Sequence, residues 1–400
     1  MNRRDFVKLA AASPALVSPV FAGCSPGNSG GNASGTVIGT PSLDSQTGFT
    51  FYSPLAEEWY RAGKYFEWTS TTRNNEGRRV NVFYRTFGNR SNPALVILHG
   101  VSQSSFDFRD FIPFLEEDYF VAILDFPGFG FSDKPLDGYS YMLEDDAKLV
   151  DYFVQEIVEL SQVNILTHSR GGSVGLAFLG NYMDIDEKKY EITYQFLTAS
   201  GFFMPLVNLP ETMMDRLHPV RGPEQIRQQQ AQPRLTQGTP EGLARADIEA
   251  FNDGISASLY TARYQLERVV NGDRWLNNLR ESSVPTALIW GLQDTANPIR
   301  LANHVWLNHI DKRSVESSYW ILPTVNHNPH REEPEEMAEI IRSCLEGGIP
   351  APEDEKSFMW ARARARDRTA TSAVYVGRAT AENTLFPPGA VEYSPDGYSF

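Results

Sequence analysis

Short, continuously apolar segments alternate with longer amphipathic segments through the middle of this chain, and this alternation constrains its fold more than any other feature. A short apolar run bounded by turn residues is typical of a strand that is covered on both faces. When such strands alternate with helices, right-handed crossovers place them in a mostly parallel sheet. The expected strands lie at 94–98, 121–125, 163–167, 195–200, 285–290 and 318–322. The sequence therefore predicts an α/β fold with a doubly wound, mostly parallel sheet.

The segments before, within and after this pattern have different sequence signals. Residues 65–69 and 79–86 are β-rich and joined by the turn Asn74-Asn75-Glu76-Gly77, which indicates an opening antiparallel pair. Between 204 and 278 the strand signal stops, and a polar, helix-prone stretch punctuated by prolines indicates an inserted helical lid. We therefore expect a core at 46–203 and 279–348, a lid at 204–278, and a C-terminal extension at 349–400 whose basic run 361–368 is a solvated face.

The N-terminus carries an export pattern. Arg3-Arg4 is followed by Asp5, Phe6, Val7 and Lys8, as in twin-arginine signals, and then by an apolar run too short to span a bilayer. Phe21-Ala22-Gly23-Cys24 resembles a lipoprotein processing box, although Phe21 replaces the usual aliphatic residue, so a plain signal peptide is the alternative. We expect a signal at 1–24, lipid attachment at Cys24, a flexible linker at 25–45, and a periplasmic or cell-envelope location.

The composition excludes some partners. The chain has 36 basic and 50 acidic residues, a formal net charge of −14, so nucleic acid and anionic lipid are not expected as main partners. Membrane contact is expected only through the N-terminal lipid. The chain shows no metal cluster or phosphate-cradling loop with supporting context, so no cofactor and no metal are expected. A disulfide between Cys24 and Cys344 is not expected.

The string Ile165-Leu166-Thr167-His168-Ser169-Arg170-Gly171-Gly172 lies where a buried strand turns abruptly into a helix. Such a turn crowds the backbone on both sides of a nucleophile and requires small flanking residues. Gly171 and Gly172 meet this need, whereas Thr167 stands where a glycine is usual. Ser169 is the predicted nucleophile, and a buried serine that caps the helix is the alternative.

A serine needs a histidine base and a carboxylate that orients the base. Asp294 follows the strand at 285–290, and His327 follows the last strand, in the order Ser, Asp, His. The alternatives are that Asp294 caps the helix near Pro298 and that His327 is a surface residue. His330 is a competing base.

An oxyanion hole needs two preset backbone N–H groups. The N–H of Arg170, directly after the nucleophile, is the first candidate. The N–H of Val101, after the turn at His99-Gly100, is the second. His99 is expected to have a structural role.

Together these motifs resemble the α/β-hydrolase superfamily over about residues 65–348. The string Asp125-Phe126-Pro127-Gly128-Phe129-Gly130-Phe131-Ser132 looks most like the branch that holds haloalkane dehalogenases, epoxide hydrolases and capped esterases. Dehalogenases and epoxide hydrolases use an aspartate nucleophile where this chain has Ser169, and dehalogenases place a tryptophan where it has Arg170. Both departures argue against carbon–halogen chemistry. Tyr260 and Tyr264 are interpreted as a packed helix face, not as ring-opening tyrosines.

The resemblance implies a serine hydrolase that cleaves small carboxylic esters through an acyl-enzyme. The alternatives are a hydrolase of carbon–carbon bonds, lactones or amides with the same three residues, and a non-catalytic binding protein of this fold.

Overall fold

A central sheet organises the molecule. The computed structural model describes residues 41–234, 238–311 and 313–348, and the backbone of 374–379. Within these residues nine strands form one sheet in the order β11-β10-β9-β8-β7-β5-β6-β4-β3. The strands are β3 (Lys64–Thr69), β4 (Arg79–Phe87), β5 (Ala94–Leu98), β6 (Phe120–Leu124), β7 (Gln162–His168), β8 (Glu191–Thr198), β9 (Thr286–Gly291), β10 (Ser317–Leu322) and β11 (Val374–Ala379).

The middle of the sheet is parallel and its edges are antiparallel. Each neighbouring pair from β6 through β5, β7, β8 and β9 to β10 is parallel. The strands β3 and β4 form the expected antiparallel pair, and β4 pairs antiparallel with β6. The predicted mostly parallel sheet is confirmed.

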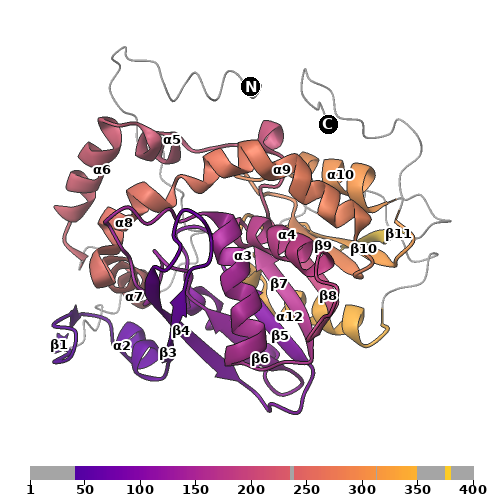
Figure 1. The fold of residues 1–400 in the computed structure, drawn as a ribbon, viewed down its shortest axis with the longest axis horizontal. Helices are drawn as coiled ribbons and strands as arrows, with labels where there is room; N and C mark the ends of the chain where they lie inside the picture. The colour runs from indigo at the N-terminus through magenta and orange to yellow at the C-terminus, as the bar shows by residue number, and fades with distance from the viewer. Residues whose placement is uncertain (1–40, 235–237, 312, 349–373, 380–400) are drawn as a thin grey trace.

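The apolar run of β5 shows why the sheet is covered on both faces. Val96 and Leu98 belong to one hydrophobic cluster, and Leu95 and Ile97 belong to a second on the opposite face. In Figure 1, α3 and α4 lie in front of the strands, and α12 lies behind them. The helices are α2 (Pro54–Arg61), α3 (Leu143–Tyr152), α4 (Arg170–Met183), α5 (Glu211–Leu217), α6 (Arg221–Gln230), α7 (Pro240–Ala250), α8 (Gly254–Thr261), α9 (Tyr264–Glu281), α10 (Ile299–Val305), α11 (Pro329–Glu332) and α12 (Pro334–Leu345).

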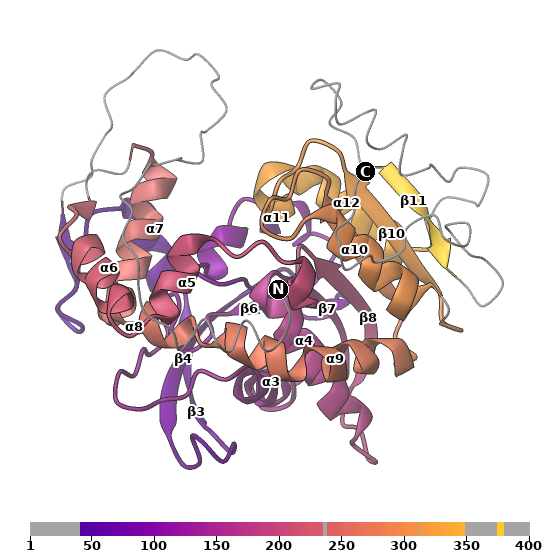
Figure 2. The same cartoon turned by 90° about the horizontal axis from the view of Figure 1, so that it is seen from above.

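The segment predicted to be a lid contains helices, and Figure 2 shows α5 to α8 grouped on the side of the molecule away from β11. Its last helix does not stop at the predicted boundary of 278. Instead α9 continues to Glu281, because Leu279 is fully buried in the same cluster as Val174 of α4. The helix α9 therefore belongs to both the lid and the core.

The structure also corrects both ends of the predicted core. Residues Ser42–Leu43 of the expected linker form β1, which pairs with β2 (Thr50–Phe51), because the Asp44 side chain accepts turn N–H groups from Gln46 and Thr47. Beyond 348, β11 adds an antiparallel edge strand to β10. The predicted signal at 1–24, the lipid site Cys24 and the basic run 361–368 lie outside the described residues. In the part that is described, no helix is long and apolar enough to cross a membrane.

Candidate active site

Four loops of the predicted site meet at one edge of the sheet. The parallel strands β5, β7, β9 and β10 all end there, and the carboxyl edge is where sites of parallel sheets form. These loops carry Val101, Ser169, Asp294 and His327. The topology alone therefore brings together residues that lie more than two hundred positions apart in the sequence.

Ser169 occupies the turn between β7 and α4 in a strained conformation. Its φ is 52° and its ψ is −112°, a region that costs a non-glycine residue about 1–3 kcal/mol. The Ser169 N–H donates to Thr198 O at 3.0 Å, which holds the turn against β8. A Cβ at Gly171 would lie 2.2 Å from Leu98 O, so the backbone approach of this turn to β5 requires glycine there.

Thr167 stands in place of the usual upstream glycine, and α4 provides the space for its side chain. A Cβ at Gly175 of α4 would lie 2.7 Å from Thr167 Cγ2, so the absence of a side chain at 175 provides the space for that methyl group. Thr167 Oγ1 also donates to Phe196 O at 3.1 Å. Gly175 is thus a residue of the elbow that the sequence motif did not identify.

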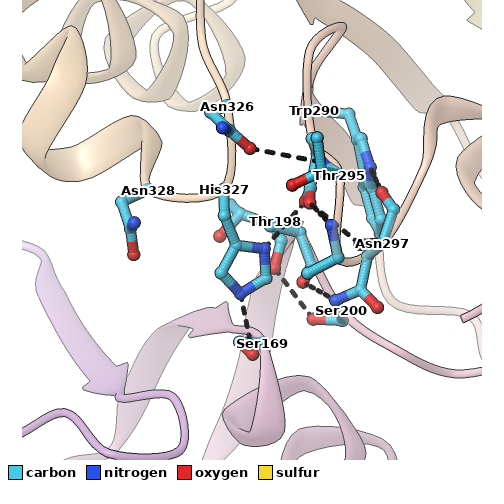
Figure 3. Close-up of polar contacts among 12 residues, drawn as sticks. Ser169, Thr198, Ser200, Trp290, Thr295, Asn297, Asn326, His327 and Asn328 are labelled. Carbon is cyan, nitrogen blue, oxygen red and sulfur yellow. Dashed lines mark hydrogen bonds and ion pairs between the residues drawn. The ribbon is translucent and has the colours of Figure 1, made fainter. Parts of the chain in front are cut away.

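The three predicted side chains form a continuous hydrogen-bonded chain. His327 Nε2 lies 3.2 Å from Ser169 Oγ, and His327 Nδ1 lies 2.8 Å from Asp294 Oδ2. Figure 3 shows the imidazole of His327 directed toward Ser169. The Asp294 side chain is fully buried and that of His327 is 24% exposed, so the imidazole can be reached by a small molecule.

The two oxygens of Asp294 have separate partners. While Oδ2 faces His327, Oδ1 accepts the N–H groups of Ala296 and Asn297 at 2.9 and 2.8 Å. The alternative of Asp294 as a local cap therefore coexists with its contact to His327. The carboxylate is fixed by its own loop, and it fixes the imidazole in turn.

Glu332 holds the loop that carries His327. Its two carboxylate oxygens accept the N–H groups of Asn326 and Asn328 at 2.7 and 2.9 Å. The loop also contacts the end of β9, where a Cβ at Gly291 would lie 2.1 Å from Asn326 O. The position of His327 thus depends on groups that no motif in the sequence marked.

Arg170 directly follows Ser169, and the loop that carries Val101 lies against Ser169. The Arg170 N–H is in the first turn of α4, where helix N–H groups have no intrahelical partner. The loop that carries Val101 lies against the serine, since a Cβ at Gly100 would be 3.0 Å from Ser169 Cβ. Gln103 Oε1 accepts the Gly100 N–H at 3.0 Å and fixes this loop.

The other histidines have structural contacts. His99 is buried, with Nδ1 2.7 Å from Gly100 O and with Nε2 accepting the Phe126 N–H, and burial lowers its pKa to about 3. His330 stacks on Phe108 with ring centroids 4.0 Å apart and makes no hydrogen bond to Ser169 in the described part of the chain. The geometry therefore favours His327, and not His330, as the base.

His168 links the loop that carries Val101 to the loop that carries His327, a role that was not predicted. Its Nδ1 lies 2.7 Å from Gln103 Oε1, and its Nε2 lies 2.8 Å from His327 O. Burial, with a further contribution from His327, holds the pKa of His168 well below its usual value. Gln103 Nε2 also donates to Asn328 Oδ1 at 2.8 Å, so the two loops are joined twice.

The side chain of Arg170 is also part of the site, although only its N–H was predicted. It is fully buried and forms an ion pair with Asp146 of α3. Burial raises the pKa of Asp146 to about 6, and Arg170 opposes that rise. The guanidinium lies over the rings of Phe126, Phe129 and Tyr264. Tyr264 is therefore a packing residue, as expected, and Tyr260 packs against the same core cluster.

A pocket adjoins the loop that follows β5. Ser102 and Gln103 line one wall, and Arg245, Glu249 and Thr261 of the lid line another. Among the described residues, no group of three or more His, Cys, Asp or Glu side chains is placed to hold a metal ion.

The sheet order and the elbow define the α/β-hydrolase fold, and comparisons with known proteins agree. A family model described as alpha/beta hydrolase fold matches residues 93–189. The chain is similar to LipZ of Mycobacterium tuberculosis, with 29% identity over 307 residues that cover 73% of this chain and 99% of LipZ.

Two solved structures show the same fold. Haloalkane dehalogenase DbeA from Bradyrhizobium elkani aligns with a TM-score of 0.57 and 16% identity over 71% of this chain and 98% of DbeA. A thermophilic esterase from Thermogutta terrifontis aligns with a TM-score of 0.52 and 19% identity over 71% of this chain and 98% of the esterase. At these identities the likeness concerns the fold alone.

Proposed function

We propose that this protein is a serine hydrolase that cleaves small carboxylic esters. The observation that carries the proposal is the position of His327, whose two ring nitrogens face Ser169 Oγ and Asp294 Oδ2. The relatives are compatible with hydrolytic chemistry, since one neighbour of the fold is named an esterase.

The proposed reaction follows from these contacts. Ser169 Oγ attacks the ester carbonyl carbon while its proton moves to His327 Nε2, and Asp294 stabilises the imidazolium that forms. The carbonyl electron pair moves to oxygen and is stabilised by the N–H groups of Arg170 and Val101. When the tetrahedral intermediate collapses, His327 donates the proton to the leaving alkoxide. Water then attacks the acyl-enzyme with the same base, releasing the acid and regenerating the serine.

The alternative nucleophilic chemistries of this fold are less compatible with the site. A mechanism through an alkyl-enzyme ester needs a carboxylate where the hydroxyl of Ser169 stands. The Arg170 side chain is turned away into an ion pair with Asp146 and cannot hold a halide as a tryptophan would. A purely binding role does not account for the aligned serine, histidine and aspartate.

Substitution of the serine tests the proposal. We expect Ser169→Ala to lower the turnover of a short-chain nitrophenyl ester by roughly 10⁴-fold or more, because the remaining site only binds and polarises the ester. Turnover is measured with purified protein and compared with Ser104→Ala, which changes a buried serine outside the triad. Full turnover by Ser169→Ala would contradict the assignment.

We also propose that the chain is exported by the twin-arginine pathway and acquires a lipid at Cys24. The support is the Arg3-Arg4 pattern and the box that ends at Cys24. Replacing Arg3-Arg4 by Lys-Lys is expected to leave the protein in the cytoplasm of the producing cell, as measured by fractionation. Export that is unchanged would contradict the first part, and an unmodified Cys24 in the mass of the exported protein would contradict the second.

A further inference from the structure

A lid side chain reaches the backbone of the proposed nucleophile. Arg268 lies on α9 and is 3% exposed. Its Nη2 donates to Ser169 O at 3.1 Å, and its Nε donates to Ser173 Oγ at 2.8 Å. The guanidinium fork thus spans the first turn of α4, with one contact at the elbow itself.

The contacted carbonyl belongs to a peptide group with a second role. Ser169 C=O and Arg170 N–H are the two ends of one peptide bond, which is planar and trans. A donor on the carbonyl oxygen therefore fixes the direction in which the N–H points. Hydrogen bonds in a chain also polarise one another, so a charged donor on the oxygen strengthens the N–H as a donor. This N–H is the first candidate for the oxyanion hole.

The charge of Arg268 is not neutralised by a nearby carboxylate. In the described part of the chain, no ion pair includes Arg268. Its neighbours are Arg170, a second cation, and the phenol of Tyr264, whose pKa is raised by burial. Burial lowers the pKa of Arg268, and Arg170 lowers it further. The contact with the Tyr264 ring, at 4.7 Å, compensates only in part. Burying a charge without an opposite charge beside it is costly, so its position beside Ser169 calls for a functional reason.

The neighbouring residue on α9 holds the lid in the same place. Glu267 accepts the Leu143 N–H at 2.6 Å and the Glu144 N–H at 3.3 Å, which caps the N-terminus of α3. Consecutive lid residues thus contact the N-terminal ends of α3 and α4. The placement of the Arg268 fork therefore depends on the docking of α9.

We propose that Arg268 is a positioning residue of the oxyanion hole, which orients and polarises the Ser169–Arg170 peptide from the lid. The inference rests on the proposed serine-hydrolase function. The docked helix α9 thus helps to stabilise the transition state, in addition to covering the substrate.

The test compares Arg268→Met, Arg268→Lys and the control Arg263→Met, which changes an exposed arginine of the lid. Substrate is a short-chain nitrophenyl ester, and the inhibitor is a trifluoromethyl ketone, whose adduct with the serine carries an oxyanion. For Arg268→Met we expect kcat to fall roughly 10- to 100-fold, with KM within about threefold and inhibitor affinity falling in proportion to kcat. Arg268→Lys, which keeps the charge but not the fork, should fall between wild type and Arg268→Met.

A structural role alone would give a different pattern. All variants are assayed below their thermal unfolding midpoints, so that loss of folded protein is not counted as loss of kcat. A kcat of Arg268→Met equal to that of Arg263→Met, or a lowered kcat with unchanged inhibitor affinity, would overturn the inference. If Arg268→Met does not fold, wild-type kcat and inhibitor affinity in Arg268→Lys would overturn it. A wild-type protein that turns over no ester contradicts the proposed function instead.

Discussion

At the scale of single residues, the elbow depends on compensation between neighbours. Ser169 has a positive φ, and Thr167 adds a methyl group where the turn has little space. The space comes from Gly175, in the second turn of α4, because a Cβ there would clash with Thr167 Cγ2. The elbow therefore accommodates Thr167, although its sequence motif lacks the usual glycine at that position.

This compensation predicts the effect of filling the space. Gly175→Ala is expected to lower the free energy of unfolding by up to about 2 kcal/mol, because overpacking costs about 1–3 kcal/mol and the gain in helix propensity offsets only about 1 kcal/mol of it. Chemical denaturation measures the change. In a Thr167→Ser background, which removes Cγ2 but keeps the hydroxyl, the same substitution should be neutral or stabilising. Equal destabilisation in both backgrounds would disprove the coupling.

At the scale of elements, the sequence predicted the strands and loops that are marked by short, local sequence patterns. Strands such as β5 and β9 are buried on both faces, so their apolar runs stand out, and their ends determine where the loops of the site must lie. The order of Ser169, Asp294 and His327 along these loops was enough to predict that the three meet. Only the structure gives the distances between them.

The parts that could not be predicted depend on contacts between distant segments. Arg268 reaches Ser169 O across 99 positions, and Gln103 reaches His168 across 65. Neither residue belongs to a recognisable motif. From the sequence alone, an arginine on a polar helix is expected to be exposed to solvent, and only its contacts show that it is buried. The short edge strands β1 and β11 were missed for a similar reason, because an edge strand is defined by its pairing partner.

At the scale of the whole molecule, buried histidines make stability depend on pH. Burial lowers the pKa of His99 to about 3 and those of His304 and His309 to about 4, and it holds the pKa values of His168 and His330 well below the usual value. Between about pH 6.5 and the lower pKa values of the folded state, the unfolded chain binds protons at these positions and the folded chain does not. Each of these residues therefore makes the folded state less stable as the pH falls.

His330 offers a way to measure this effect. Its ring stacks on Phe108, and within the described residues neither ring nitrogen has a hydrogen-bond partner, so phenylalanine can replace the ring contact. Between pH 6 and pH 5, His330→Phe is expected to reduce the loss of unfolding free energy by about 1 kcal/mol relative to wild type. Denaturation curves at both pH values provide the test. Identical losses in the two proteins would show that His330 is not held neutral.

The proposed function depends on one reactive atom, Ser169 Oγ. A fluorophosphonate reacts with a serine that has an aligned base and oxyanion hole, and the labelled residue can be located by mass spectrometry of peptides. We predict a single label on Ser169 in native protein, and no label after denaturation or in His327→Ala. Native protein that takes no label, under conditions in which a known serine hydrolase is labelled, or a label on another serine, would contradict the proposed site.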